Sequence, residues 1–395
     1  MLRFVAVLFA VLGFACGVLA ADAKGEVGPG VPAFAVRPGL RVTLASDKLE
    51  EARFLCFDDK GTLYCSQPTK GNIVALREPD ASGVYRKVSV YIKDKPKVHA
   101  MCFHNGWLWF AQSTSIGKAR GMKEDGSAQE IATIIPAGKL PGLGGHWWRS
   151  LLVDDDGFYT SIGDSTNLTD ESKTNPDRQK IWHYNLEGGD KKLFASGIRN
   201  TERLLYRPGT KELYGCDHGT DNFGQKFGER TGQLQPITDL NPGEEFNHYV
   251  QGGFYGHPFL VGNNMPRPEF ADREDIIEMA KTAIPPEFLF HAHWAPNGWR
   301  FVTSDYFPGF KGDAVICFHG SWNSVQKVGY RVERLLFDEW SGKPYGSLRL
   351  VGTLSEDGRR VLARPVDVIE AADGTLLWSA DDTKQIYRIS KADGK

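Results

Sequence analysis

The chain has 395 residues, with 47 Lys and Arg against 49 Asp and Glu, which gives a formal net charge of −2. This balance excludes the strongly basic surface that binding to nucleic acid or to an anionic membrane requires. Length alone favours two domains, but all-β propellers of this size fold as one domain.

Residues 1–20 have the pattern of a secretory signal peptide. Arg3 precedes an apolar run, residues 5–20, and small residues allow cleavage after Ala20 or Ala23. A lipid anchor at Cys16 is disfavoured because the bulky Phe14 stands where a small or aliphatic residue is usual. No other stretch approaches the ~20 apolar residues of a membrane span. We therefore expect a periplasmic or secreted protein.

From residue 57 onward a hairpin signature recurs, in which a turn with Asp, Asn or Gly precedes an apolar, often aromatic strand. Glycine supplies the positive φ of such turns. The six turn glycines are Gly61, Gly106, Gly157, Gly209, Gly298 and Gly374. The first three intervals, 45, 51 and 52 residues, match one four-stranded propeller blade per copy, and the wider later intervals indicate blades with long loops.

These repeats predict an all-β fold, a single six-bladed β-propeller with long inter-strand loops, over residues 34–392. An early strand at residues 40–44 must pair near residues 385–391 to close the ring, because both ends would otherwise leave exposed strand edges. The segment 222–286 is rich in Gly, Pro and Asn and has no clean strand pattern before Phe254. A loop of that length is usually functional.

The most informative motif is the run Gly144–Arg149, which is followed by a predicted hairpin ending at Asp164. Two glycines free the backbone to turn, and His146 follows them. A histidine with a carboxylate to fix its tautomer is the minimum requirement for a general base at neutral pH. The alternative is a surface loop whose His146 and Arg149 face water.

Two further segments carry polar groups. Arg199 offers a planar fork suited to a carboxylate, and Asn200 follows it. The run 217–221 offers main-chain carbonyls and carboxylates suited to a hard cation. The alternative for its acidic residues, and for Glu244 and Glu245, is the capping of blade turns or solvated charge.

Histidines and cysteines leave simpler alternatives open. His291, His293 and His319 suggest a metal site, but hydrogen-bonded lining of a polar channel is the more common role. The five cysteines beyond the signal segment form no CxxC motif. We expect them to be small buried hydrophobes, with at most one or two disulfides.

Taken together, these segments resemble the glucose/sorbosone dehydrogenase family of soluble quinoprotein sugar dehydrogenases, and the sorbosone dehydrogenase-like branch is the closer match. The matching segments, in the family's order, are GGHWWRSLLVDDDGFYTSIGD, GIRNTERLLYRPGTKELYGCDHG, EEFNHYVQGGFYGHP, HAHWAPNG, AVICFHGSWN and ARPVDV. The resemblance implies a propeller that holds pyrroloquinoline quinone and calcium at one end of its axis. It also implies a small-molecule sugar substrate and a separate electron acceptor.

The resemblance further implies roles for individual residues. His146 matches the general base, and Asp164 matches the carboxylate that orients it. The residues that match cofactor-binding positions are Arg149, which has a structural or cofactor-facing role, Arg199, Asn200 and Arg364.

The chain departs from the family pattern at several positions. Gly219 and Thr220 fall where main-chain oxygens hold the calcium, with Thr220 in place of a usual proline. Glu202 places a negative charge near an anionic cofactor, Ser324 replaces an arginine that is frequent in the related branch, and His257 replaces a tryptophan.

The predicted function is therefore that of a quinoprotein dehydrogenase, which oxidises an aldose or a related sugar aldehyde or alcohol by hydride transfer to the quinone. One alternative is a calcium-dependent, lactonase-like hydrolase on the same propeller. The other is a non-catalytic propeller that binds carbohydrate or protein, which Glu202 and Ser324 favour.

Overall fold

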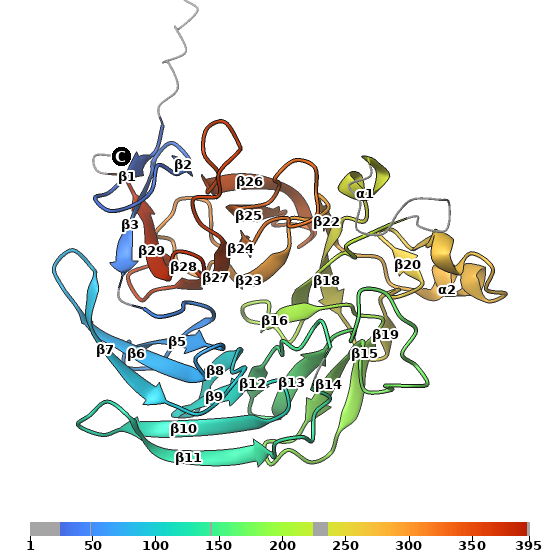
Figure 1. The fold of residues 1–395 in the computed structure, drawn as a ribbon, viewed down its shortest axis with the longest axis horizontal. Helices are drawn as coiled ribbons and strands as arrows, with labels where there is room; N and C mark the ends of the chain where they lie inside the picture. The colour runs from blue at the N-terminus through green and yellow to red at the C-terminus, as the bar shows by residue number, and fades with distance from the viewer. Residues whose placement is uncertain (1–23, 48, 143, 224–235, 393–395) are drawn as a thin grey trace, which may run out of the picture.

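Short apolar strands separated by glycine turns form six antiparallel blades around a ring in the computed structural model, which describes residues 24–47, 49–142, 144–223 and 236–392 (Figure 1). The predicted six-bladed propeller is confirmed. The expected signal peptide, residues 1–20 with cleavage extending to residue 23, and Cys16 lie outside the described residues.

Each blade is a meander of four strands that follow one another from the axis outward. Blade 1 consists of β4 (Leu55–Phe57), β5 (Leu63–Gln67), β6 (Asn72–Pro79) and β7 (Tyr85–Ile92). Blade 2 consists of β8 (Met101–His104), β9 (Trp107–Ala111), β10 (Ile116–Met122) and β11 (Ala128–Ile135). Blade 3 consists of β12 (Leu152–Asp154), β13 (Gly157–Ile162), β14 (Lys180–Tyr184) and β15 (Lys192–Ser196).

The other three blades complete the ring. Blade 4 consists of β16 (Thr201–Tyr206), β17 (Leu213–Asp217), β18 (Glu244–Tyr249) and β22 (Phe288–Phe290). Blade 5 consists of β23 (Pro296–Phe301), β24 (Ala314–Phe318), β25 (Arg331–Phe337) and β26 (Pro344–Gly352). Blade 6 consists of β27 (Pro365–Glu370), β28 (Leu376–Ala380), β29 (Gln385–Lys391) and β3 (Leu40–Ser46).

Minor elements decorate the blades. The strands β1 (Glu26–Val27), β2 (Ala35–Val36) and β19 (Gly253–Phe254) extend blades 6, 5 and 3, and β20 (Leu260–Val261) pairs with β21 (Met265–Pro266). The described helices are α1 (Pro236–Leu240), the 3-10 helix η2 (Pro268–Phe270) and α2 (Ile276–Thr282). No helix within the described residues has the length and hydropathy to cross a membrane.

The core lies between the blades, where each sheet packs on the next. The second strands β5, β17, β24 and β28 are buried along their whole length because neighbouring blades cover both of their faces. Six apolar clusters occupy the six inter-blade spaces. Burial is therefore continuous around the ring.

The ring closes as predicted, through pairing of an early strand with a late one. β3 is the fourth strand of blade 6 and lies antiparallel to β29, with Leu44 opposite Tyr387. This pairing joins the two ends of the domain and leaves neither as a free edge.

One detail of the repeat prediction is wrong. Gly298 is not a turn residue but lies inside β23, where a Cβ atom would come within 1.9 Å of Asp367 Oδ1. The β23–β24 connection instead contains Gly309 and Gly312, both with positive φ. Gly298 is required by a close approach between neighbouring inner strands, which has the same sequence signal as a turn.

The segment 222–286 is also more regular than predicted. It contributes β18, the third strand of blade 4, well before Phe254. The buried residues of this strand include Glu244 and Asn247, so its apolar pattern is interrupted by polar side chains.

All five described cysteines are free, and four of them are buried.

Candidate active site

A cavity of about 470 Å³ opens at one end of the propeller. In a four-stranded meander, the loop from strand two to strand three and the loop to the next blade emerge at the same end of the sheet. Loops of these two kinds from five blades line the cavity. The predicted residues that they bring together are His146, Arg199, Asn200, Gly219 and Arg364.

His146 reaches the cavity from the loop that precedes β12. Gly144 has a φ of +94°, and its neighbour Gly145 donates its N–H to the Ser165 carbonyl at 2.6 Å. A Cβ atom on Gly144 would lie 2.7 Å from that same carbonyl oxygen, so the glycine allows the two loops to pack closely. The turn predicted at these glycines is present.

The protonation state of His146 follows from its surroundings. Its Nδ1 lies 2.8 Å from the main-chain carbonyl of Asp164, which can only accept a hydrogen bond. Nδ1 must therefore carry the proton, and Nε2 keeps its lone pair. Burial, followed by the positive charge of Arg199, lowers the pKa of His146 well below its ordinary value. The neutral, basic form is favoured at neutral pH.

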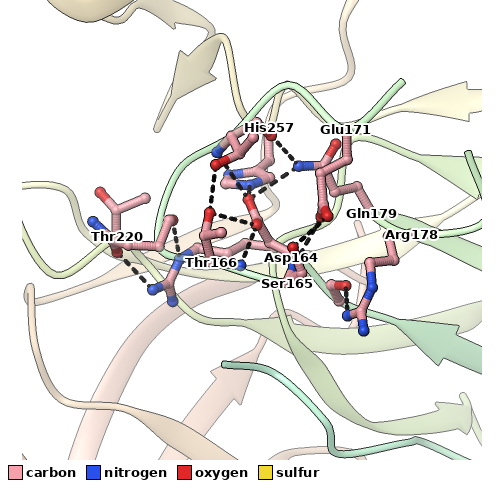
Figure 2. Close-up of polar contacts among 12 residues, drawn as sticks. Asp164, Ser165, Thr166, Glu171, Arg178, Gln179, Thr220 and His257 are labelled. Carbon is pink, nitrogen blue, oxygen red and sulfur yellow. Dashed lines mark hydrogen bonds and ion pairs between the residues drawn. The ribbon is translucent and has the colours of Figure 1, made fainter. Parts of the chain in front are cut away.

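The prediction that the Asp164 carboxylate orients His146 is wrong, because the main-chain carbonyl of Asp164 holds the imidazole instead. That carboxylate is fully buried and accepts hydrogen bonds from Thr166 N at 2.7 Å and Gln179 Nε2 at 3.0 Å. It also lies 2.7 Å from His257 Nε2, and Figure 2 shows it enclosed by these partners. Since its side chain turns toward β14 and the loop after β13, only its carbonyl remains to hold His146.

Arg149 does not face the cavity, which corrects its cofactor-binding assignment. Its guanidinium is fully buried and donates to the main-chain carbonyls of Pro141, His146 and Trp148. Burial, together with the nearby charge of Arg178, lowers the pKa of Arg149 to about 9. The residue stabilises the loop that carries His146.

Arg199 and Asn200 are held in the cavity wall by carboxylates. Both main-chain N–H groups donate to Asp217, at 2.8 and 2.6 Å, so Asp217 has the capping role that was the simpler alternative. The Arg199 guanidinium donates to Asn167 Oδ1 at 2.8 Å and to Asp221 Oδ2 at 3.3 Å. A planar cation therefore stands at a fixed position in the wall.

Glu202 does not leave an uncompensated negative charge beside the cavity. Its carboxylate lies 3.5 Å from Arg53 Nη2 and 3.4 Å from His99 Nε2. Burial acts to raise the pKa of Glu202, but His99, Arg53 and His218 outweigh it and lower that pKa to about 2. Glu202 is thus paired with Arg53, a cavity residue that the sequence did not predict and that Glu202 shares with Asp381.

The opposite wall contains Arg364 and His319. Arg364 Nε donates to the His319 carbonyl at 3.2 Å, and His319 Nε2 lies 3.0 Å from Asp381 Oδ1. Asp381 also accepts from Arg53 at 2.7 Å. The described part of the cavity lining includes Arg53 as a third arginine and does not include Ser324.

The predicted calcium ligands Gly219 and Thr220 lie beside each other on the β17–β18 loop. The N–H of Gly219 donates to Glu244 Oε2 at 2.7 Å, and the Thr220 hydroxyl accepts from Arg267 at 2.7 Å. Gly219 lines the main cavity and also a small adjoining one, which Thr220 lines as well. Among the described residues, no group of three or more His, Cys, Asp or Glu side chains could hold a metal.

The remaining histidines favour the simpler alternative. His293 and His319 line the cavity, while His291 bonds locally to the Ala292 carbonyl. His293 Nε2 lies 2.7 Å from the Thr238 carbonyl. They are hydrogen-bonded lining residues.

Comparison with known proteins places this geometry in a family. The TrAA12-like family model matches residues 34–392. A Trichoderma reesei carbohydrate-active enzyme of family AA12 is 19% identical, with a TM-score of 0.78 over 92% of this chain and 98% of that one. The pyrroloquinoline quinone domain of Coprinopsis cinerea pyranose dehydrogenase is 18% identical, with a TM-score of 0.77 over 93% of this chain and all (100%) of that one.

A curated sequence relative gives no activity to compare. An uncharacterized protein of Borreliella burgdorferi is 28% identical over 250 residues, which are 62% of this chain and 60% of that protein. The chain thus matches less than two thirds of that relative's length. The family model nevertheless covers nearly the whole propeller, and the predicted resemblance to quinoprotein sugar dehydrogenases is confirmed. The chain belongs to the TrAA12-like family.

Proposed function

We propose that this protein is a pyrroloquinoline quinone-dependent dehydrogenase that oxidises a sugar, with His146 as the general base. The observation that carries the proposal is the fixed tautomer of His146, whose Nδ1 is held at 2.8 Å by a carbonyl in the wall of an arginine-rich cavity. The family and the similarity to the Coprinopsis domain support the same class of chemistry.

The residues present fit the cofactor. Pyrroloquinoline quinone carries three carboxylates, and the cavity offers the guanidinium groups of Arg53, Arg199 and Arg364, of which the first two also pair with carboxylates of the protein. Two buried polar atoms in the lining, His218 Nε2 and Asn323 Oδ1, have no hydrogen-bond partner in the described structure. Unpaired buried atoms of this kind call for a polar ligand.

When bound, the quinone would supply the two-electron acceptor for the hydride of the sugar carbon. The chain's own contribution is at His146, whose Nε2 takes the proton of the sugar hydroxyl. Because burial and Arg199 keep the imidazole neutral, the base is ready at neutral pH. Arg149 holds the loop in place, and the Asp164 carbonyl holds the imidazole ring of His146.

We also propose calcium as a cofactor, held through the carbonyls of Gly219 and Thr220. Two neutral carbonyls are a weak site by themselves, so other ligands must complete the coordination. The adjoining small cavity is lined by Asp217 and Glu245, which place oxygen atoms nearby. Calcium binding and quinone binding are therefore expected to depend on each other.

The two alternative functions gain little from this geometry. The carboxylate of Glu202, which favoured a propeller without a cofactor, lies beside Arg53, which it shares with Asp381, and beside the His99 imidazole. A lactonase-like hydrolase requires metal-binding side chains along the tunnel, and the described residues offer no such cluster. We keep export to the periplasm or beyond, and a separate electron acceptor, as parts of the proposal.

The test is calorimetry of the purified protein with quinone and calcium, followed by dye reduction with sugars. We expect saturable quinone uptake that requires calcium, and loss of both uptake and turnover after chelation. Absence of saturable uptake would favour the non-catalytic alternative. Dye reduction that survives exhaustive chelation would exclude calcium.

A further inference from the structure

Trp322 is both a lining residue of the cavity and a strongly exposed side chain. It lies on the β24–β25 loop and lines the cavity, yet 71% of its surface is exposed. A large aromatic ring left in water at the mouth of a polar cavity is typical of a surface that binds a ligand.

The ring is held in one orientation. The indole Nε1–H donates to Asp221 Oδ1 at 3.2 Å, and the other Asp221 oxygen lies 3.3 Å from Arg199 Nη2. Asn323, the next residue, donates from its side-chain amide to the Asp221 carbonyl. The polar edge of the indole is thus tied to the opposite loop, and most of the ring surface remains open to solvent.

Polar side chains share the rim with this ring. Thr166 is exposed, Asn167 is half-buried, and both line the same cavity on the β13–β14 loop. A pyranose ring presents an apolar C–H face together with hydroxyl groups at its edge. An aromatic face beside amides and hydroxyls is complementary to both features.

We propose that Trp322 is the platform of a second sugar subsite, on which the pyranose ring next to the oxidised unit stacks. The inference rests on the proposed function of the cavity and makes oligosaccharides, rather than free monosaccharides alone, the substrate class. The subsite lies at the rim because the oxidised sugar must reach His146 inside the cavity, and the rest of a chain then passes Trp322.

The test compares three variants on glucose, cellotetraose and maltotetraose. In Trp322→Ala, the ratio of kcat/KM for the preferred tetrasaccharide to that for glucose should fall about two- to twelvefold, the size of one lost aromatic contact. Trp322→Phe should retain most of the ratio because it keeps an aromatic face. The matched control is Trp340→Ala, since Trp340 is 97% exposed on the β25–β26 hairpin and does not line the cavity.

A second measurement does not depend on the loaded enzyme. Calorimetry of cofactor-free protein should show tetrasaccharide binding that weakens in Trp322→Ala and not in Trp340→Ala. If the wild type binds tetrasaccharide in this way but oxidises no sugar, the subsite stands and the proposed dehydrogenase function fails.

Three outcomes would overturn the subsite. The first is a turnover ratio and tetrasaccharide affinity that are unchanged in Trp322→Ala. The second is an equal loss for glucose and tetrasaccharide together with weaker quinone binding, which would assign the ring to the cofactor. The third is a loss seen only with cytochrome c as acceptor and not with dye, which would assign the ring to acceptor docking.

Discussion

Two Asp–His pairs flank the cavity, and they differ in what they can do. Asp164 and His257 are both buried, lie 2.7 Å apart and stand behind the cavity wall. Asp381 and His319 lie 3.0 Å apart beside the cavity, and Asp381 also binds Arg53. The catalytic candidate, His146, belongs to neither pair.

The difference teaches how a base is recognised. A carboxylate beside an imidazole stabilises its protonated form, although burial outweighs this for His257 and His319 and lowers their pKa values, whereas a carbonyl fixes the tautomer without adding a charge. His146 has the carbonyl and, in addition, a neighbouring arginine that disfavours its protonation. The two Asp–His pairs therefore support the walls, and the histidine without a carboxylate partner is the one that we propose as the base.

The largest effect is expected at His146. His146→Ala should lower sugar-dependent dye reduction by about a hundred- to ten-thousandfold, the usual contribution of a positioned general base. The fold should persist, because the residue lies in a loop and is only partly buried. Circular dichroism and quinone affinity serve as the controls.

The two pairs supply matched variants for that measurement. Asp164→Asn should reduce turnover less than His146→Ala, since the main-chain carbonyl that holds the imidazole is unchanged. Near-full turnover in His146→Ala with quinone bound would place the base elsewhere, and His218, His293 and His319 would become the candidates in this cavity.

Stability should separate the two aspartates. Asp164→Ala removes the acceptor of several buried donors and leaves His257 without its partner, so we expect a loss of about 3–5 kcal/mol in the free energy of unfolding. Asp381→Ala should lose less, because its carboxylate is 20% exposed and water can replace it. Urea unfolding measures both, and a larger loss for Asp381→Ala would contradict the comparison.

Cofactor binding should respond to the arginines. Arg199→Ala should weaken quinone binding by about 1.5–3 kcal/mol, the scale of a charge-assisted hydrogen bond. Arg149→Ala is the informative counterpart, since its guanidinium binds loop carbonyls and not the cavity. In this variant the loss in the free energy of unfolding should exceed the loss in the free energy of calcium-dependent quinone binding. Calorimetry at low temperature measures the quinone binding. A direct loss of affinity without loss of stability would restore Arg149 as a cofactor residue.

The sequence predicts the propeller and most of the cavity because both depend on local signals. A turn glycine followed by an apolar strand is readable within about ten residues. The loops with His146, Arg199 and Gly219 each follow such a strand, so topology alone brings them to one end of the ring.

What the sequence does not predict depends on side-chain direction and on contacts between distant residues. The Asp164 side chain turns away from His146 because its carboxylate binds Gln179 and His257. No local sequence pattern predicts this orientation. Arg53 and Asp381 are 328 residues apart and meet only because the ring closes. The only sequence signal for Arg53 was its position just before a predicted inner strand, and this signal is weak.

The smallest effect concerns pH, and its sign can be derived. The pKa of His146 is lowered in the folded protein, first by burial and then by Arg199. Below its ordinary pKa of about 6.5, the unfolded chain binds a proton at this residue that the folded protein refuses. Stability should therefore be fully present above that pH and decrease as the pH falls below it.

The comparison of wild type and His146→Ala by urea unfolding at pH 7.5 and 5.5 isolates this contribution. The wild type should lose more stability on acidification than the variant, although His257 and His319, whose pKa values are also lowered by burial, act in the same direction in both proteins. The rate should follow the same titration, because only the neutral imidazole accepts a proton. The acidic limb of kcat/KM should then lie well below pH 6.5 in the wild type and be absent in the residual activity of the variant. A limb near pH 6.5 would mean that His146 is solvated in the working enzyme and that Arg199 is neutralised by the bound ligand.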